Sequence, residues 1–246
     1  MISFLLALQF LTILPVRIRK VSSSRLAWAP LYFPLVGFFL GALLAGINSL
    51  LFSLNFPQLS TDIVLVIALA MITGGIHLDG LADTADAFLS GKPKEEMLAI
   101  MRDPHIGTMG VLSMTSVLLL KISLLLALPA SLKIASLLLM CVLSRWSLVL
   151  SMFLFPYARS NGKARVFIEG MNAKIFIIST VIACLLGFLT WQMRGLLVMA
   201  VVCAVVFLLG RFILRRIGGI TGDTLGAVNE LAEVAVLCVV IILGGG

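Results

Sequence analysis

Two adjacent apolar stretches decide the fold, and they read IFIISTVIACLLGFLTWQ at residues 175–192 and GLLVMAVVCAVVFLLGRFIL at residues 195–214. Each has close to the ~20 apolar residues that an α-helix needs to cross a bilayer about 30 Å thick. Only Met193 and Arg194 lie between them. We therefore predict two successive membrane-spanning helices in this part of the chain.

Five further segments have a similar apolar character, and they lie at residues 31–54, 62–76, 108–128, 132–155 and 225–243. The segment at 62–76 is short for a span, so we expect it to continue into the polar stretch after Ile76. The sequence thus predicts an all-α polytopic membrane bundle of about seven transmembrane helices. Residues 1–246 form a single membrane domain in this interpretation.

The N-terminal stretch up to Val16 is apolar, but at about 14 residues it is short for a span. It has neither a basic start nor a small-residue cleavage site, so we do not expect a signal peptide. We predict an interfacial or re-entrant helix that ends at Pro15 and leads into basic residues.

The composition agrees with a membrane protein. Hydrophobic residues make up 61% of the chain and charged residues 12%, with a mean hydropathy of +1.18, whereas soluble domains average about half apolar and about a quarter charged. The net charge of +7 does not indicate nucleic-acid binding, because the basic residues sit in short loops between apolar runs, where they set membrane topology. The cysteines all fall inside apolar runs, so no disulfide is expected.

The basic residues also predict the orientation. Loops rich in Lys and Arg alternate along the chain with nearly neutral loops, beginning with a basic N-terminal stretch that holds Arg17, Arg19, Lys20 and Arg25. Because basic loops remain in the cytoplasm, we expect a multi-pass inner-membrane protein with a cytoplasmic N-terminus and a periplasmic C-terminus. The long connections that hold most acidic residues and both histidines then lie on the cytoplasmic face.

The strongest chemical signal is HLDGLADTADAF at residues 77–88. Its aspartates, Asp79, Asp83 and Asp86, fall within an arc of about 60° on one helix face. Like charges at this spacing repel one another, and a divalent cation removes that penalty. Oxygen ligands on a rigid helix suit Mg²⁺ bound together with a diphosphate. The alternative is a solvated, acidic helix end.

A second cluster, MRDPHIGTMG at residues 101–110, leads into the next apolar segment. Arg102 is a candidate phosphate ligand, and Asp103 could extend the metal shell. The glycines would let the backbone approach a ligand closely. The alternative is a capped loop with an Arg–Asp pair, and His105 is equally compatible with an interface role.

A third cluster, GGITGDTLGAVNE at residues 218–230, enters the last apolar segment. A glycine-rich turn that opens a helix presents free N–H groups to an anion. Asp223 and Glu230 share one helix face, and an acid within the membrane is a functional candidate. Arg145, inside the segment 132–155, needs an anionic partner, which a carboxylate or a substrate phosphate would supply.

Together with LQFLTILPV at residues 8–16, these three clusters closely resemble cobalamin synthase, a family also called adenosylcobinamide-GDP ribazoletransferase or cobalamin-5′-phosphate synthase. The resemblance runs along nearly the whole chain, with matching length and segment order. It implies a Mg²⁺-dependent inner-membrane enzyme that joins adenosylcobinamide-GDP to α-ribazole or its 5′-phosphate. The products are adenosylcobalamin, or its 5′-phosphate, and GMP. This reaction completes the nucleotide loop of cobalamin.

The resemblance also implies site residues. Metal ligands are expected at Asp79, Asp83 and Asp86, and catalytic residues at Asp83, Asp86 and Asp103, with Asp86 or Asp103 accepting the proton of the ribazole 3′-hydroxyl. His77 is a weaker candidate for the base because it points to another side of the helix. The residues expected to bind substrate are Arg102, Arg145, Thr221, Gly222, Asp223 and Glu230. His105 falls where some members carry another residue.

Three other functions remain to be separated. A CDP-alcohol phosphotransferase also places aspartates on facing helices, but the Ala-Arg that follows the Asp-Gly pair in its signature is missing after Gly80. An aspartate-rich prenyltransferase would need a second Asp-rich loop. A transporter would place its polar residues near the midplane, whereas here they gather at one face. The sequence leaves open whether the chain forms a homo-oligomer or associates with other enzymes of the cobalamin pathway.

Overall fold

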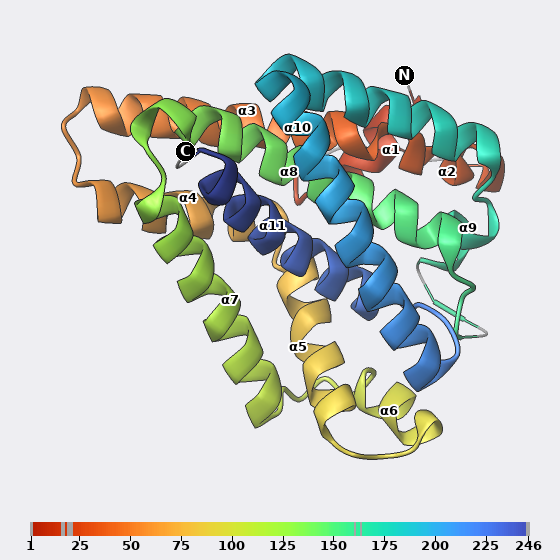
Figure 1. Cartoon of the computed structure of the whole chain (residues 1–246). Helices are drawn as coiled ribbons and strands as arrows, with labels where there is room; N and C mark the ends of the chain where they lie inside the picture. The colour runs from red at the N-terminus through yellow and green to blue at the C-terminus, as the bar shows by residue number, and fades with distance from the viewer. Residues whose placement is uncertain (1, 16–17, 19–21, 160, 163, 245–246) are drawn as a thin grey trace.

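The computed structural model describes residues 2–15, 18, 22–159, 161–162 and 164–244, which form an assembly of helices (Figure 1). The basic residues Arg17, Arg19 and Lys20 lie outside the described residues. In chain order the helices are α1 (Ile2–Leu11), α2 (Ser23–Ala27), the 3-10 helix η1 (Ala29–Tyr32), α3 (Phe33–Ser53), α4 (Gln58–Ile72), α5 (Ile76–Leu89), α6 (Lys94–Ile100), α7 (Thr108–Ala127), α8 (Ala130–Leu154), α9 (Arg165–Glu169), α10 (Ala173–Ile217) and α11 (Gly222–Gly244).

The predicted all-helical membrane bundle is confirmed. Within the described residues, the helices long and apolar enough to cross a membrane are α7, α8, α10, α11 and the stretch Arg25–Ser53, which contains α3. A sixth span results if α4 and α5 are taken together, although they are bent by 88°. The expected segment at 62–76 is therefore interrupted. Gly74 and Gly75 adopt φ values of +63° and +68°, a left-handed backbone that ends α4 and starts a new direction.

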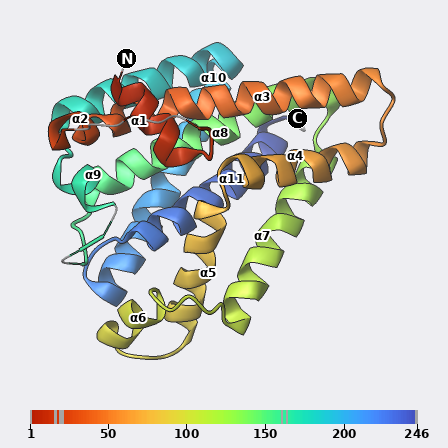
Figure 2. The same ribbon diagram turned by 180° about the vertical axis from the view of Figure 1, so that it is seen from behind.

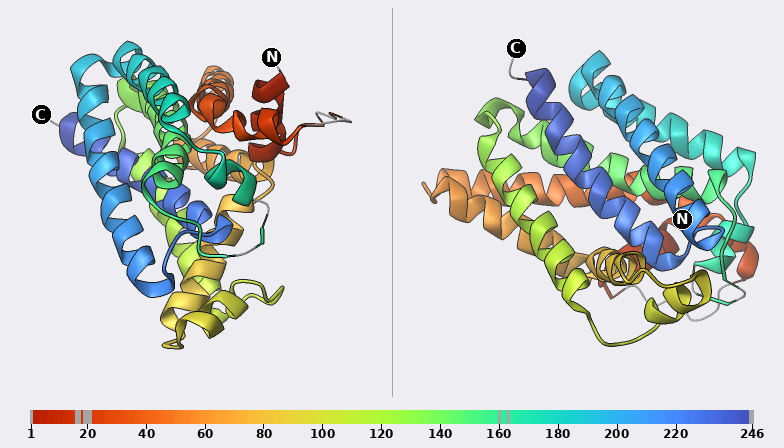
Figure 3. Two further views of the ribbon diagram at one scale, coloured as in Figure 1. Left: turned by 90° about the vertical axis from the view of Figure 1, so that its right-hand side faces the viewer. Right: turned by 60° about the horizontal axis from the view of Figure 1, so that its bottom comes forward.

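The two stretches that decide the fold are the two limbs of α10. Trp191 and Gln192 have non-helical backbone angles inside this helix, and the chain folds back on itself there (Figure 3). The sulfur atoms of Cys184 and Met199 lie 3.6 Å apart, one on each limb. The limbs are thus antiparallel neighbours, as two successive spans require.

The first helix exists but is shorter than predicted. α1 ends at Leu11 and not at Pro15, and it buries Leu6, Ala7 and Leu11. It packs against η1, α3 and α2. Its predicted interfacial position stays a prediction.

Helix α8 lies at the centre of the bundle and buries most of its length. α3, α10 and α11 all pack against it, and α11 runs diagonally between α5, α7 and α8 (Figure 1). The outer faces of α3, α7 and α10 expose large apolar side chains, including Phe52, Leu119 and Leu208. Such side chains suit contact with lipid.

The connections differ at the two ends of the bundle. α1, α2, α5, α6 and α9 gather at one end, together with the connections at 101–107 and 218–221 (Figures 1 and 2). The short connections between α3 and α4 and between α7 and α8 lie at the other end, with the C-terminus. A Cβ atom added at Gly244 would lie 3.8 Å from Trp191, at the α10 reversal. The polar end carries the candidate site.

Candidate active site

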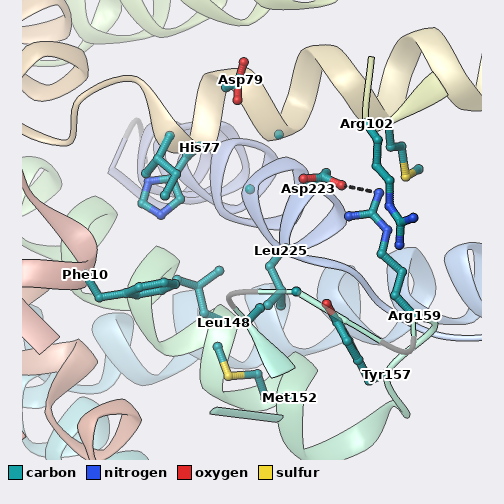
Figure 4. A pocket seen from close by; sticks show the side chains of 17 residues that line it. Phe10, His77, Asp79, Arg102, Leu148, Met152, Tyr157, Arg159, Asp223 and Leu225 are labelled. Atoms are coloured by element: carbon teal, nitrogen blue, oxygen red, sulfur yellow. Dashed lines mark ion pairs between the residues drawn. The ribbon is translucent and has the colours of Figure 1, made fainter. Parts of the chain in front are cut away.

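A cavity of about 530 Å³ opens at the polar end of the bundle (Figure 4). The residues that line it belong to α1, α5, α8, α11 and the connections that precede α7 and α9. The polar residues that line it are His77, Asp79, Arg102, Tyr157, Arg159 and Asp223. The cavity thus brings residues from all three predicted clusters to one place.

The close crossing of α5 and α11 joins the first cluster to the third. A Cβ atom added at Gly80 would lie 2.6 Å from the carbonyl oxygen of Asp223, and one added at Gly226 would lie 2.9 Å from the carbonyl oxygen of His77. Both positions therefore require glycine at this helix separation. The crossing places Asp79 of α5 and Asp223 of α11 on the wall of one cavity.

The acidic side of the cavity concentrates negative charge. Asp83 lies one turn after Asp79 and is half-buried. The carboxylates of Asp79, Asp223 and Asp86 are all near enough to repel its negative charge. Arg159 offsets part of this negative charge, and the remainder favours a bound cation, as the sequence predicts.

Two guanidinium groups form the basic side. Arg159 pairs with Asp223 at 2.7 Å, whereas the guanidinium group of Arg102 has no hydrogen bond or ion pair with the residues that the structure describes. Both side chains line the cavity (Figure 4). Neighbouring cations of this kind suit a ligand with more than one phosphate. Burial also raises the pKa of Tyr157, which lines the cavity nearby.

The start of α11 is held by a reciprocal cap. The N–H of Thr224 donates to Oγ1 of Thr221 at 3.1 Å, and the N–H of Thr221 donates to Oγ1 of Thr224 at 2.8 Å. Thr221 is fully buried and does not line the cavity, whereas Gly222 and Asp223 do. Of the three residues of this cluster that were predicted to bind substrate, only Gly222 and Asp223 line the cavity. Thr221 instead holds the start of the helix that carries them.

Asp86 is turned toward α7 and away from the cavity. Its carboxylate accepts hydrogen bonds from the N–H of Gly107 at 2.7 Å and of Gly110 at 2.8 Å. These bonds satisfy N–H groups that the first turn of a helix leaves free. A side chain at either glycine would collide with this carboxylate, so the glycines of the second cluster serve this contact.

Asp103 lies in an exposed connection outside the cavity. Its carboxylate accepts from the backbone N–H of His105 at 3.0 Å and contacts Nδ1 of the same residue at 2.6 Å. These hydrogen bonds lower the pKa of Asp103. The side chains of Asp103 and His105 are 55% and 89% exposed, so the predicted catalytic Asp103 is not brought together with the other carboxylates.

Arg145 and Glu230 belong to a separate, buried network. Arg145 pairs with Glu233 at 2.5 Å, Glu230 pairs with Lys121 at 2.5 Å, and Lys121 also contacts Glu233. The partner of Arg145 is therefore a protein carboxylate, one of the two alternatives that the sequence left open. None of these residues lines the cavity.

Sequence reasoning missed Arg159, Tyr157 and Lys121. In the sequence, Arg159 is one of several basic residues in a connection and indicates only membrane orientation. No motif around it indicates a binding site. Lys121 could have been found, because it is a charged residue in the middle of an apolar segment, where a partner is obligatory.

Comparison with known proteins decides the family. The model of the family described as cobalamin-5-phosphate synthase matches residues 3–241. The chain belongs to this family. Relatives named adenosylcobinamide-GDP ribazoletransferase include a protein of Pseudomonas syringae pv. syringae, 40% identical over 99% of this chain and 100% of its own length. A relative with the same name from Desulforamulus reducens is 34% identical over 98% of this chain and 96% of its own length.

A third relative with the same name, from a Roseiflexus species, is 38% identical over 94% of this chain and 86% of its own length. No solved structure matches the chain. The family membership agrees with the resemblance seen in the sequence.

Proposed function

We propose that the chain catalyses, at this cavity, the reaction stated in its relatives' name. It joins adenosylcobinamide-GDP to α-ribazole or α-ribazole 5′-phosphate and releases GMP. This proposal rests on one observation: a single cavity is lined by Asp79, by Arg102 and by the ion pair of Arg159 with Asp223. Carboxylates for a cation and guanidinium groups for phosphates are the components that phosphoryl transfer requires.

The carboxylates of the cavity fit Mg²⁺ by their chemistry. Among the residues described, no three His, Cys, Asp or Glu side chains converge closely enough to hold a metal alone. Mg²⁺ in phosphoryl-transfer sites commonly takes only one or two carboxylates and fills its other positions with substrate oxygens and water. Asp79 and Asp83 would supply them. When bound, Mg²⁺ neutralises charge on the diphosphate and on the leaving phosphate.

The basic side holds and orients the substrate. Arg102 is free to bind a phosphate, and the pairing of Arg159 with Asp223 fixes the position of its guanidinium group. Two adjacent guanidinium groups can hold both phosphates of the cobinamide-GDP diphosphate. This clamp aligns the cobinamide-linked phosphorus with the attacking hydroxyl, and alignment supplies much of the catalysis in such reactions.

The attacking group is the ribazole 3′-hydroxyl. Its oxygen bonds to the cobinamide-linked phosphorus, the bond from that phosphorus to the GMP oxygen breaks, and the hydroxyl proton passes to a carboxylate. A carboxylate oxygen of Asp79 or Asp223 that does not bind the metal is the best candidate for this base, because both residues line the cavity. The predicted alternatives fit less well, since Asp86 is held by α7 and Asp103 lies outside the cavity.

The orientation follows from the same site. The polar end of the bundle carries the cavity and most long connections, so this end faces the cytoplasm in our proposal, and the loops at the other end face the periplasm. The aqueous nucleotide substrates then meet the bilayer-embedded enzyme on the side where nucleotides are available.

Turnover by the purified protein in liposomes tests the proposal. With adenosylcobinamide-GDP, α-ribazole 5′-phosphate and Mg²⁺, we expect GMP and a corrinoid that carries its nucleotide loop, both lost on adding EDTA. Parallel reactions with CDP-diacylglycerol or a prenyl diphosphate separate the rival transferases. Product from either of these, and none from the corrinoid, would overturn the proposal.

A further inference from the structure

The cavity has a second, apolar side that the phosphate chemistry does not use. Phe10 from α1, Leu148 and Met152 from α8, and Leu225 from α11 form this apolar side. Leu148, Met152 and Leu225 are at most 4% exposed. In Figure 4 these side chains lie on the opposite side of the cavity from Arg102. A surface of this kind suits a flat apolar group.

One polar side chain, His77, belongs to the apolar side. It is 6% exposed and lines the cavity, and in Figure 4 it lies near Phe10 and Leu148. Neither ring nitrogen has a hydrogen-bond partner among the described residues, and Nδ1 is enclosed by protein whereas Nε2 is not. A ligand that enters the cavity can therefore bind at Nε2 and supply the partner that this polar atom lacks.

We propose that the apolar side receives the base of the ribazole substrate, and that His77 donates a hydrogen bond to the one unsubstituted nitrogen of that base. This inference rests on the proposed function. The dimethylbenzimidazole base of α-ribazole is a flat, apolar bicycle whose second ring nitrogen carries the ribose. A single donor set in an apolar wall is complementary to it.

The other groups of the two substrates fit this side less well. Guanine has donors and acceptors along its edges, and burying them against Phe10, Leu148 and Met152 would leave them unsatisfied. The corrinoid macrocycle is too large for a cavity of about 530 Å³ that must also hold part of a nucleotide. The benzimidazole base is therefore the occupant that the lining favours.

This placement also brings the reacting groups together. With the base against Leu148 and Leu225, the ribose extends toward Asp79 and Asp223, where the diphosphate is held. The corrinoid then stays outside the cavity and only its phosphate enters. His77 is thus a specificity-determining residue and takes no part in the proton transfer.

Comparing α-ribazole 5′-phosphate with its deaza analogue, in which C–H replaces the free ring nitrogen, tests the hydrogen bond. We expect the wild-type protein in liposomes to prefer α-ribazole phosphate by about tenfold in kcat/KM. His77→Leu should remove this preference and leave the KM for adenosylcobinamide-GDP unchanged, and His77→Asn should restore part of it. A His77→Leu protein that keeps the wild-type preference would overturn the proposal. Absence of any preference in the wild type would do the same.

A change in the apolar wall gives a second test that does not depend on His77. Leu148→Ala enlarges the apolar side, so it should raise kcat/KM for a ribazole analogue with a third fused ring by roughly tenfold relative to α-ribazole phosphate. The matched control is Leu154→Ala on the same helix, where the side chain is 42% exposed. An unchanged ratio in Leu148→Ala would contradict the proposal. Wild-type protein without any ribazole transfer would instead contradict the proposed function.

Discussion

Two groups of charged side chains lie along α11, and they differ in whether their charges are paired. The buried network of Lys121, Arg145, Glu230 and Glu233 joins α7, α8 and α11 and contains two basic and two acidic residues. In the cavity near the start of α11, by contrast, pairing is incomplete. Arg159 pairs with Asp223, but the Arg102 side chain has no partner among the described residues, and more carboxylates than cations surround Asp83. Complete pairing therefore distinguishes charges that hold helices together from a group that includes charges available to a ligand.

The difference follows from the cost of burying charge. An ion taken out of water loses several kcal/mol of hydration, which only close partners and hydrogen bonds offset. Glu233 has such partners, since Asn229 also donates to its carboxylate at 3.1 Å. At the cavity, Asp79 is exposed to solvent, so its charge can remain unpaired until a cation and phosphates bind.

Breaking the buried network should have the largest effect. Glu233→Ala leaves Lys121 and Arg145 without their common partner, and removing one member of a buried pair costs about 3–5 kcal/mol. We expect loss of most folded protein, measured by thermal unfolding in detergent micelles. The control is Glu96→Ala, whose ion pair with Lys92 is 56% exposed on both sides and should be worth less than about 1 kcal/mol. Equal stability of the two variants would contradict a structural role for the network.

Removing a carboxylate from the acidic side of the cavity should abolish activity and preserve the fold. Asp79→Ala and Asp83→Ala should each lower kcat by on the order of a thousandfold, because the metal supplies several kcal/mol of charge stabilisation. Their unfolding temperatures should match the wild type, since neither carboxylate has a hydrogen-bond partner to lose among the residues that the structure describes. Glu95→Ala, on exposed α6, is the control for a lost acid. Normal turnover in both aspartate variants would remove these residues from the site.

The sequence predicted the elements well because helix periodicity and apolar length are local properties. Most of the apolar segments and the acidic face of α5 follow from them, whereas the break between α4 and α5 and the end of α1 at Leu11 do not. The partners of each side chain did not follow, because they depend on contacts between distant segments. Glu233 meets Lys121 across 112 positions, and Asp86 meets Gly107 across 21. Spacing placed Asp86 on the face of Asp79, but it could not show that the start of α7 lies next to that end of the face.

Arg159 tests the basic side of the cavity. Arg159→Ala should raise the KM for adenosylcobinamide-GDP by roughly tenfold to a hundredfold, because a hydrogen bond to a charged group is worth about 1.5–3 kcal/mol. Arg159→Lys should recover part of this loss, since lysine supplies the charge without the bidentate geometry. Arg194→Ala is the control, because Arg194 lies beside Trp191 at the opposite end of the bundle. A KM effect only on the ribazole substrate would place the phosphates elsewhere.

Asp86 lies on the acidic helix face that the sequence predicts, but its carboxylate already has hydrogen-bond partners in the protein. Its substitution therefore tests whether a partnered carboxylate of this face has a structural role and not a catalytic one. Asp86→Ala removes the acceptor for the N–H groups of Gly107 and Gly110, and losing a helix cap costs about 0.5–2 kcal/mol. We expect a slightly lower unfolding temperature and turnover within about tenfold of the wild type, since Arg102 lies on the connection that leads to this cap. If kcat instead falls as far as in Asp79→Ala, then Asp86 turns toward the metal when substrate binds, and pairing alone does not identify structural charges.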